Sequence, residues 1–258
     1  MNIVIFTGGN PPEFTDFMTV YSRIVEEDDI IIAADSGLEA LIHFSDSMKK
    51  YTDQKDENFT IQEMGLGSIK LCTCLKPSFI LGDMDSLKDR GMLKLFPDAE
   101  VLEFDAYKDL TDTELSLIKA HELNPEANVI LVGGNGGRPD HFIGILETFS
   151  SDYSPSVWLC GPQVIYKLSD GQILTAGHLK EKDCISIARV FSSSTDGFVR
   201  TEGLEWGDEC MRKKGMPSIS NKVKKTGTES VVTVSAEGAS FLVFLPYSVS
   251  VKVQRKDR

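Results

Sequence analysis

The chain has 258 residues, of which 41% are hydrophobic and 26% charged, a composition typical of a folded protein with one or two domains. Its 27 Lys and Arg against 39 Asp and Glu give a formal net charge of −12, which disfavours non-specific binding to nucleic acid or anionic membranes. No apolar run approaches the roughly 18 residues of a membrane helix, and we expect the N-terminus to form a strand, not a signal peptide. The five cysteines are odd in number and have no C-x-x-C spacing, so we expect reduced thiols in a cytoplasmic protein.

The first half of the chain alternates short apolar runs with helical patterns. The runs are 3–6, 30–34, 79–81 and 129–132, and the clearest helical patterns are 38–44 and 112–123. This alternation predicts an α/β domain with a mostly parallel sheet, which we assign to residues 1–150. Every run ends in Gly, Asp or both, and ligands of parallel sheets bind beyond the carboxyl ends of the strands. For any single run, turn formation is the simpler explanation of these residues.

Residues 45–76 are polar and irregular, and we expect an insertion or a mobile surface excursion there. Within it, Cys72 and Cys74 lack the second pair or His cluster that would complete a metal site, so we interpret them as thiols.

After about residue 150 the sequence changes to short β-like runs separated by Gly, Asp-Gly and Ser clusters. The runs are 157–160, 164–168, 173–174, 184–190, 197–200, 231–235 and 241–244. This pattern predicts an all-β sandwich in residues 151–258, with the boundary in residues 150–155.

The segment Gly82-Asp83-Met84-Asp85-Ser86 places two carboxylates two residues apart. In an extended chain Asp83 and Asp85 face the same side, roughly 6.7 Å apart, and repel by about 2.5 kcal/mol at an effective dielectric of about 20. A divalent cation bound between the two carboxylates would replace this repulsion with attraction, and Mg²⁺ prefers such oxygen ligands. A simple D-x-D turn explains the segment equally well.

Residues 107–114 have the features of a helix start. Thr111 and Glu114 have the spacing of a capping box, and Asp112 in the first turn favours the helix dipole. Lys108 and Asp109 precede the cap and are less well explained by local structure. They could point into a cleft, where the helix N-terminus would also favour a phosphate.

Residues 133–141 carry the strongest single signal, with four glycines in five residues followed by Arg138, Asp140 and His141. The glycines free the backbone for close approach to a ligand, and successive N–H groups can surround an anion. Arg138 can clamp phosphate oxygens. The spacing is neither that of a Rossmann fingerprint nor that of a Walker-A loop. We interpret the loop as functional, although His141 alone fits a structural role as well as a catalytic one.

Two blocks stand out in the second half. Trp206 lies beside a turn and could stack on a flat heteroaromatic ring, although a tryptophan in the core is the commoner case. The second block is Ser218-Ile219-Ser220-Asn221.

Taken in chain order, these blocks resemble the thiamine pyrophosphokinase family. The matching blocks are residues 33–37, 82–86, 108–112, 133–141, 203–206 and 218–221. The resemblance implies an α/β catalytic domain that binds ATP and a C-terminal β-sandwich that binds thiamine. It also implies a homodimer with active sites at the subunit interface. The implied reaction transfers the diphosphoryl group of ATP to the thiamine hydroxyl, giving thiamine diphosphate and AMP.

The resemblance also implies roles for individual residues. It implies that Asp83, Asp85 and Asp109 bind Mg²⁺ with the triphosphate, and that these three act in catalysis together with Asp112, Arg138 and Asp140. The implied ATP contacts are Asp35, Lys108, Thr111, Gly134, Gly136, Gly137, Arg138 and His141. The implied thiamine contacts are Trp206, Ser220 and Asn221, reached from the partner subunit.

Two features depart from the usual family pattern. Ser36 stands where the family usually has a second glycine, and the stretch 45–76 is longer than usual. In the implied mechanism, the thiamine hydroxyl attacks the β-phosphorus in line, and either Asp112 or Asp140 accepts the hydroxyl proton.

Three other functions fit parts of the pattern. A pyrophosphokinase for another hydroxymethyl heterocycle, such as a pterin, would need the same acidic cluster and glycine loop. A metal-dependent phosphohydrolase would release phosphate with no acceptor present, and a non-enzymatic nucleotide-binding module would bind ATP without producing AMP. Trp206 and the 218–221 block favour thiamine as the acceptor.

Overall fold

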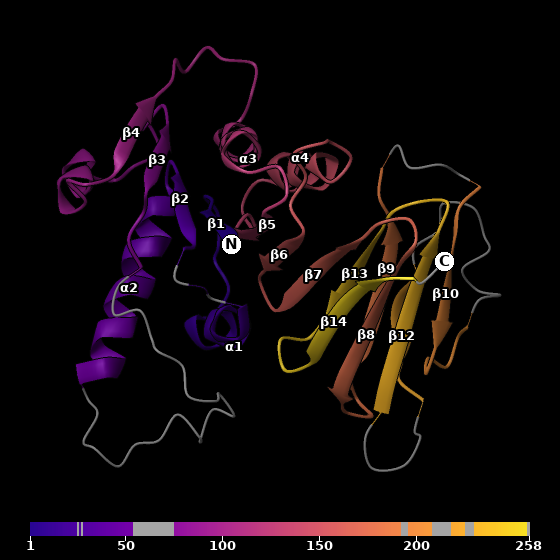
Figure 1. The fold of residues 1–258 in the computed structure, drawn as a ribbon. Coiled ribbons are helices and arrows are strands. Elements are labelled where there is room, and N and C mark those ends of the chain that lie inside the picture. The colour runs from indigo at the N-terminus through magenta and orange to yellow at the C-terminus, as the bar shows by residue number, and fades with distance from the viewer. Residues whose placement is uncertain are drawn as a thin grey trace. The chain divides into compact units, whose positions relative to one another are not determined.

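The structure, a computed structural model, describes residues 1–24, 26, 28–53, 75–191, 196–207, 218–224 and 230–256. The chain divides into two compact units (Figure 1). The first contains residues 1–148 with 153–161, and the second contains residues 149–152 with 162–258.

The first unit is built on a parallel sheet with helices. In spatial order its described strands are β6 (Val157–Cys160), β5 (Asn128–Val132), β1 (Asn2–Phe6), β2 (Ile30–Ala34), β3 (Phe79–Gly82) and β4 (Glu100–Glu103), each parallel to its neighbours. The helices are α1 (Phe14–Ile24), α2 (Gly37–Asp53), α3 (Asp112–Leu123) and α4 (Pro139–Thr148), with the 3₁₀ helix η2 (Arg90–Leu95) between β3 and β4. In the described ranges, no helix combines the length and the apolar character needed to cross a membrane.

The central strands are buried because nearly all of their side chains are apolar. All five residues of β1 are buried, and so are four of the five residues in each of β2 and β5. Helix α2 packs on β1 and β2, and α3 packs on β1, β2 and β3. Continuous burial of this kind is typical of parallel strands with both faces covered, as the sequence predicted.

The order of the strands reverses between β1 and β5. From β1 the chain adds β2, β3 and β4 on one side, and it then returns through α3 to β5 on the other side of β1. Ligands of open α/β sheets bind at such a switch point, beyond the carboxyl ends of the strands. The loops that follow β1 and β5 are therefore the expected walls of a ligand site.

Strand β6 belongs to this parallel sheet, and the assignment of residues 157–160 to the later β-rich part of the sequence was wrong. The strand pairs in parallel with β5, with Val157 opposite Ile130 and Leu159 opposite Val132. Its four residues are all buried. A short apolar run predicts a strand, but it does not determine which sheet the strand joins.

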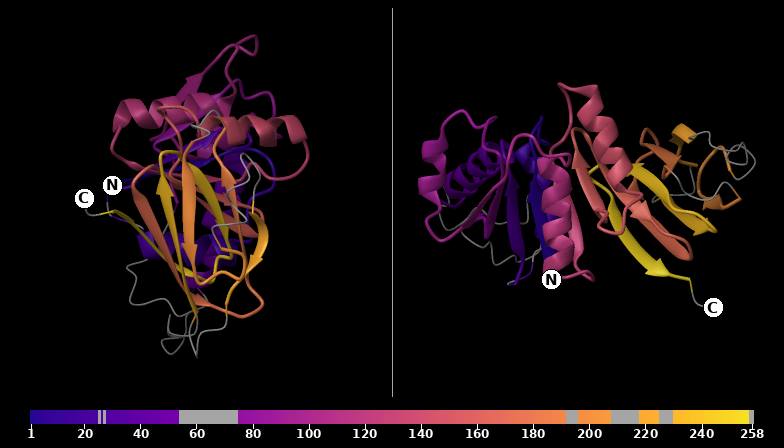
Figure 2. Two further views of the ribbon diagram at one scale, coloured as in Figure 1. Left: turned by 90° about the vertical axis from the view of Figure 1, so that its right-hand side faces the viewer. Right: turned by 90° about the horizontal axis from the view of Figure 1, so that it is seen from above.

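The second unit is formed by antiparallel strands, and its described residues contain no helix (Figure 2). One group has the order β11 (Ser218–Lys222), β9 (Cys184–Arg189), β13 (Phe241–Leu245) and β7 (Gln163–Leu168). The other has the order β10 (Phe198–Glu202), β12 (Ser230–Glu237), β8 (Gln172–Leu179) and β14 (Ser250–Arg255). Neighbouring strands within each group pair in antiparallel fashion. These strands confirm the predicted change to β-rich sequence in the second half.

Helix α2 includes residues that the sequence analysis placed in an irregular insertion. It extends to Asp53, so residues 45–53 are helical, whereas residues 54–74, including Cys72 and Cys74, lie outside the described residues. The polar sequence is compatible with a helix because an exposed helical face needs no apolar side chains. Met48, at 3% exposure, supplies the buried face of this segment.

An aromatic cluster holds α1 and α2 against β1. Phe44 of α2 contacts Phe6 of β1 and Phe17 of α1, with ring centroids 5.9 and 5.0 Å apart. The ring of Phe14 also packs against that of Phe44, with the ring centroids 5.6 Å apart. The side chain of Phe44 is 1% exposed, so its truncation would leave a cavity inside the cluster.

We expect Phe44→Ala to lower the free energy of unfolding by about 3–5 kcal/mol, because apolar burial is lost and a cavity remains. Leu95, which is 62% exposed, provides the control. Leu95→Ala should change the free energy of unfolding by less than about 0.5 kcal/mol. Urea unfolding followed by circular dichroism measures both variants, and equally small changes would contradict the packing of α2 on β1.

Candidate active site

Polar and small residues follow four neighbouring strands at the carboxyl edge of the parallel sheet. Thr7 comes directly after β1, Asp35 after β2, Asp83 after β3 and Gly133 after β5. Helix α3 begins at the same edge, where the Thr113 hydroxyl oxygen lies 2.6 Å from that of Thr7. The topology therefore gathers residues from widely separated parts of the sequence.

Three carboxylates meet at this edge, those of Asp35, Asp83 and Asp112. Each offers an oxygen within 4.8 Å of the other two. At that separation two unit charges repel by roughly 3 kcal/mol or more at an effective dielectric of about 20. Asp35 is 6% exposed, and its Oδ1 is buried with no hydrogen-bond partner among the described residues. Buried oxygens with one of them unpaired fit a hard divalent cation such as Mg²⁺.

Gly82 allows Asp35 and Asp112 to approach each other. Its φ of +147° is a conformation that favours glycine. A Cβ at this position would lie 2.9 Å from the Cβ of Asp35 and 3.3 Å from the Cγ of Asp112. Any side chain here would push against both acidic residues, so the glycine is part of the construction of the cluster.

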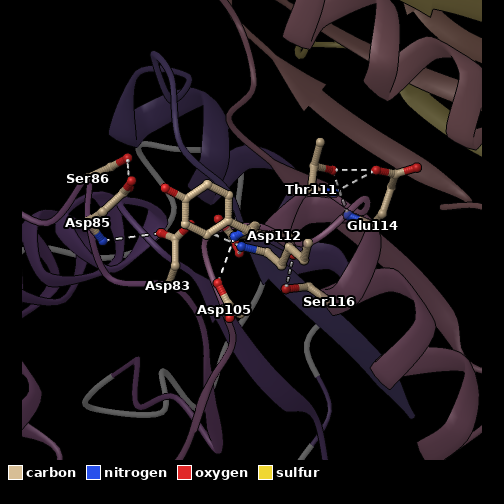
Figure 3. A network of polar contacts seen from close by, with 10 residues as sticks. Asp83, Asp85, Ser86, Asp105, Thr111, Asp112, Glu114 and Ser116 are labelled. Atoms are coloured by element: carbon tan, nitrogen blue, oxygen red, sulfur yellow. Dashed lines mark hydrogen bonds and ion pairs between the residues drawn. The ribbon is translucent and has the colours of Figure 1, made fainter.

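Lys108 lies between two of the three carboxylates. Its Nζ is 3.1 Å from Oδ2 of Asp83 and 3.1 Å from Oδ1 of Asp112. All three side chains are largely buried, so the ammonium neutralises part of the charge where water screens it weakly. Figure 3 shows Asp83, Asp85 and Asp112 gathered at this place. Three carboxylates and one ammonium leave two negative charges, which suits a divalent cation.

The surroundings move the pKa values of the three carboxyl groups in different directions. Burial raises the pKa of Asp35, and the hydrogen bonds it accepts offset this only in part. Burial also raises the pKa of Asp112, against the lowering effect of Lys108. At Asp83 burial acts in the same direction, but hydrogen bonds from Lys108 and from a backbone N–H outweigh it and lower the pKa. Carboxyl groups with such divergent pKa values are characteristic of functional sites.

Asp85 lies in a turn beside the cluster. Met84 has a φ of +59°, so residues 83–85 turn, and the extended conformation assumed from the sequence was wrong. The turn brings the backbone N–H of Asp85 to Oδ1 of Asp83 at 3.2 Å. It leaves Asp85 exposed, where its Oδ1 accepts a hydrogen bond from Ser86 at 2.9 Å. Met84 is 2% exposed, so burial of its side chain explains why the chain turns here.

Asp109 does not belong to the carboxylate cluster found among the described residues, whereas Asp112 does. Asp109 is exposed in the loop before α3, while Asp112 is the first residue of the helix that begins at the sheet edge. The spacing of the two residues in the sequence did not distinguish these environments.

The predicted capping box at the start of α3 is confirmed. The backbone N–H of Glu114 donates to the Thr111 hydroxyl at 3.2 Å, and the backbone N–H of Thr111 donates to Oε2 of Glu114 at 2.9 Å. The Thr111 hydroxyl also donates to that oxygen at 2.8 Å. Since this hydroxyl is engaged in the cap, Thr111 serves the site by fixing the helix start that carries Asp112.

The tripeptide Gly-Gly-Asn follows both β1 and β5, at residues 8–10 and 133–135. The two copies are joined by backbone hydrogen bonds. The N–H of Gly134 donates to the Gly8 carbonyl at 2.8 Å, and the asparagine N–H of the first copy donates to the asparagine carbonyl of the second at 2.6 Å. The sequence analysis used only the second copy as a site signal, although the repetition of the tripeptide after two strands points to both.

Gly133 is held by close contacts on two sides. Its φ is +104°, and a Cβ there would lie 2.6 Å from the carbonyl oxygen of Thr7, so a larger residue does not fit. The indole N–H of Trp158 donates to the Gly133 carbonyl at 2.8 Å from a fully buried position. Trp158 therefore supports the loop from β6, a role that the sequence alone did not indicate.

The end of the glycine loop is open to solvent. Gly134, Gly136 and Gly137 have φ values of +75°, +73° and +72°, which allow the backbone to curl around an anion. Beyond them, Arg138 pairs with Asp140 through Nε–Oδ1 and Nη2–Oδ2 contacts of 3.3 and 2.6 Å. Both side chains are exposed, as is the neighbouring His141, so they are accessible to a ligand.

The three residues that the resemblance assigns to thiamine lie together in the second unit but differ in exposure. Trp206 is 47% exposed. Ser220 is also exposed, and its backbone N–H donates to the hydroxyl of Ser186 at 3.0 Å. Asn221 is fully buried, and both polar atoms of its side chain bind the backbone of Trp206. Trp206 and Ser220 are accessible to a ligand, whereas the side chain of Asn221 is occupied within the protein.

Comparison with known proteins gives one family and several similar folds. The family described as "Thiamin pyrophosphokinase, catalytic domain" matches residues 21–159, more than half of the chain. Thiamine pyrophosphokinase from Bacillus subtilis has a similar structure, with a TM-score of 0.64 and 21% sequence identity over 95% of this chain and 99% of that one. Thiamin pyrophosphokinase from Candida albicans has a TM-score of 0.58 and 14% identity over 95% and 89% of the two chains. No curated protein gave a significant match.

The raised pKa of Asp35 predicts a measurable dependence of stability on pH. Because its folded pKa lies above the ordinary carboxyl value of 3.8, the folded protein is favoured at low pH, and this contribution is lost as the pH rises through the folded pKa. Asp35→Asn should therefore raise the melting temperature at pH 7 and flatten its decline between acidic and neutral pH.

Differential scanning calorimetry across this pH range measures the effect, with Asp98→Asn as the control because Asp98 is exposed. If the wild type and Asp35→Asn had the same pH profile, burial would not raise the pKa of Asp35 in the folded protein.

Proposed function

Because the chain belongs to the thiamin pyrophosphokinase family, we propose how its residues perform the reaction of that family. The reaction transfers the diphosphoryl group of ATP to the hydroxyl of thiamine, giving thiamine diphosphate and AMP. The observation that carries the proposed roles is the meeting of Asp35, Asp83 and Asp112 at the carboxyl edge of the sheet. A site with this much negative charge can hold a triphosphate only together with cations.

We propose that Asp35, Asp83 and Asp112 hold Mg²⁺, with Asp85 beside them. The unpaired buried oxygen of Asp35 and the separation of the three carboxylates support this set over one that contains Asp109. Bound there, Mg²⁺ would neutralise charge on the triphosphate, which is its usual contribution to phosphoryl transfer.

Lys108 and Arg138 are the cationic side chains that we propose for the phosphate oxygens. Each is paired with a carboxylate in the structure, Lys108 with Asp83 and Asp112 and Arg138 with Asp140. A phosphate would replace these partners without leaving either cation unpaired. The N–H groups of the glycine loop and the N-terminus of α3 add partial positive charge at the same edge.

The thiamine hydroxyl must lose a proton as it attacks the β-phosphorus. Of the two acceptors left open by the sequence, Asp140 has its pKa lowered by Arg138, which makes it the weaker base. The pKa of Asp112 is raised by burial, which makes its carboxylate the stronger base. We therefore favour Asp112 as the acceptor, through the carboxylate oxygen that does not pair with Lys108.

For thiamine we propose contact with the exposed Trp206 and Ser220 of the β-rich residues 151–258, which would form the predicted sandwich domain. An exposed indole offers a face for stacking on the pyrimidine ring. The homodimer, with these residues reaching the site of the partner subunit, and the cytoplasmic location stay predictions. In the proposed homodimer, one subunit would hold ATP and its partner would hold thiamine.

We expect purified protein with ATP and Mg²⁺ to form AMP only when thiamine is present, with an equal amount of thiamine diphosphate detected by mass spectrometry. Asp112→Asn should lower kcat by about 100-fold or more, because the site loses both charge and a proton acceptor. Asp109→Asn provides the comparison and should lower kcat by less than about threefold. Equal losses in the two variants would support the metal set that contains Asp109, and AMP formed without thiamine would indicate a hydrolase.

The proposed sharing of sites between subunits predicts complementation. Trp206→Ala should raise KM for thiamine by about tenfold or more with little change in KM for ATP, because a stacking surface is lost. At a thiamine concentration well below KM, mixing Trp206→Ala with Asp112→Asn under conditions of subunit exchange should recover about a quarter of the wild-type activity, since half of the dimers then contain one intact site of two. Activity that stays at the average of the two variants would mean that each site is built from one chain.

A further inference from the structure

Strand β11 has an inverted burial pattern. Ile219, its only large apolar residue, is 64% exposed, whereas the polar Asn221 is fully buried. Burying a primary amide costs free energy unless its hydrogen bonds are satisfied, and exposing isoleucine gains nothing. Some local feature of the strand must therefore turn Asn221 inward, and hydrogen bonds must offset the cost of burying its amide.

The cause is a bulge in the pairing of β11 with β9. Ser218 lies opposite Ile187 and Asn221 lies opposite Ile185, so β11 uses three steps where β9 uses two. Ser220, within the bulge, has a φ of +55°. One extra residue reverses the alternation of side chains, which turns Asn221 inward and leaves Ile219 and Ser220 outside.

The compensating bonds are made to the backbone of Trp206. The Trp206 N–H donates to Oδ1 of Asn221 at 3.1 Å, and Nδ2 of Asn221 donates to the Trp206 carbonyl at 2.6 Å. A third, longer bond joins Nδ2 to the hydroxyl of Ser218 at 3.3 Å. The amide side chain thus presents to Trp206 the same donor and acceptor pair that a neighbouring strand would present.

These bonds extend a short backbone ladder by one residue. Lys224 N–H donates to the Gly203 carbonyl and Glu205 N–H donates to the Lys222 carbonyl, both at 2.8 Å. Among the described residues the backbone bonds between the two segments end there, one residue before Trp206. The amide of Asn221 therefore holds the residue that carries the exposed indole.

We propose that Asn221 is a positioning residue for thiamine, acting through the backbone of Trp206 and not through contact with the substrate. This inference rests on the proposed role of Trp206 in binding thiamine. The bulge and the buried amide fix the backbone of Trp206, whose side chain is 47% exposed. Loss of the two bonds would let the indole move, so thiamine would have to order it on binding.

The first test is the mobility of Trp206, which does not depend on activity. The chain has two tryptophans, and Trp158 is fully buried, so the signal lost in Trp206→Phe identifies the emission of Trp206. In Asn221→Ala and in Asn221→Asp, the fluorescence anisotropy of Trp206 should fall and its quenching by iodide should rise. Asn221→Asp keeps one acceptor for the Trp206 N–H, so it tests the inference even if Asn221→Ala does not fold. Unchanged anisotropy in a folded variant would overturn the proposal.

The second test separates positioning from direct contact. Asn221→Ala should raise KM for thiamine by about tenfold, the effect expected for two hydrogen bonds, with kcat and KM for ATP nearly unchanged. In the double variant with Trp206→Ala, the asparagine substitution should add almost nothing, because its target is already gone. Additive effects would show that Asn221 contacts thiamine itself and would overturn the proposal.

The control is Asn2→Ala in the first unit. Asn2 is also buried, at 6% exposure, and its amide donates to the Ile24 carbonyl at 2.7 Å. This variant should lose stability without any change in KM for thiamine. If Trp206→Ala leaves KM for thiamine unchanged, the proposed function of Trp206 fails, while the anisotropy of the Asn221 variants still decides whether this asparagine holds the indole.

Discussion

Repulsion among the carboxylates of Asp35, Asp83 and Asp112 is the constraint around which the first unit is organised. Neighbouring parallel strands deliver two of these groups to one edge, and the capped start of α3 delivers the third. Gly82 removes the side chain that would separate them, and one lysine ammonium offsets part of the charge. The fold therefore maintains a negative site whose ionisation is opposed by burial, and a bound cation relieves that opposition.

This arrangement explains how a chain with a net charge of −12 can act on a polyanion such as ATP. The overall charge repels nucleic acid, but a single nucleotide encounters only the local field at the sheet edge. There, Lys108 contacts the acidic cluster, and Arg138 and the backbone N–H groups of the glycine loop follow β5 at the same edge of the sheet. Each of the two cationic side chains already has a carboxylate partner, so neither is left unpaired before the ligand arrives.

Much of the fold could be predicted from the sequence because its signals are local. The apolar runs of the parallel strands, the capping box at Thr111 and the glycine loop each depend on residues close in the chain. The sheet that β6 joins, the position of Asp112 beside Asp35 and Asp83, and the inward turn of Asn221 depend on contacts between distant segments. The bulge in β11 is the clearest case, since one extra residue reversed the side-chain alternation that a regular strand would have.

The bonds between the two Gly-Gly-Asn loops also bear on the order in which the site is assembled. Residues 8–10 and 133–135 are separated by most of the sequence of the first unit, so their contact forms only when β5 pairs with β1. During synthesis, the nucleotide site therefore cannot exist before β5 has left the ribosome and reached β1. A ligand that needs both loops can stabilise only the completed unit, which makes binding a report on correct folding and not an aid to its early steps.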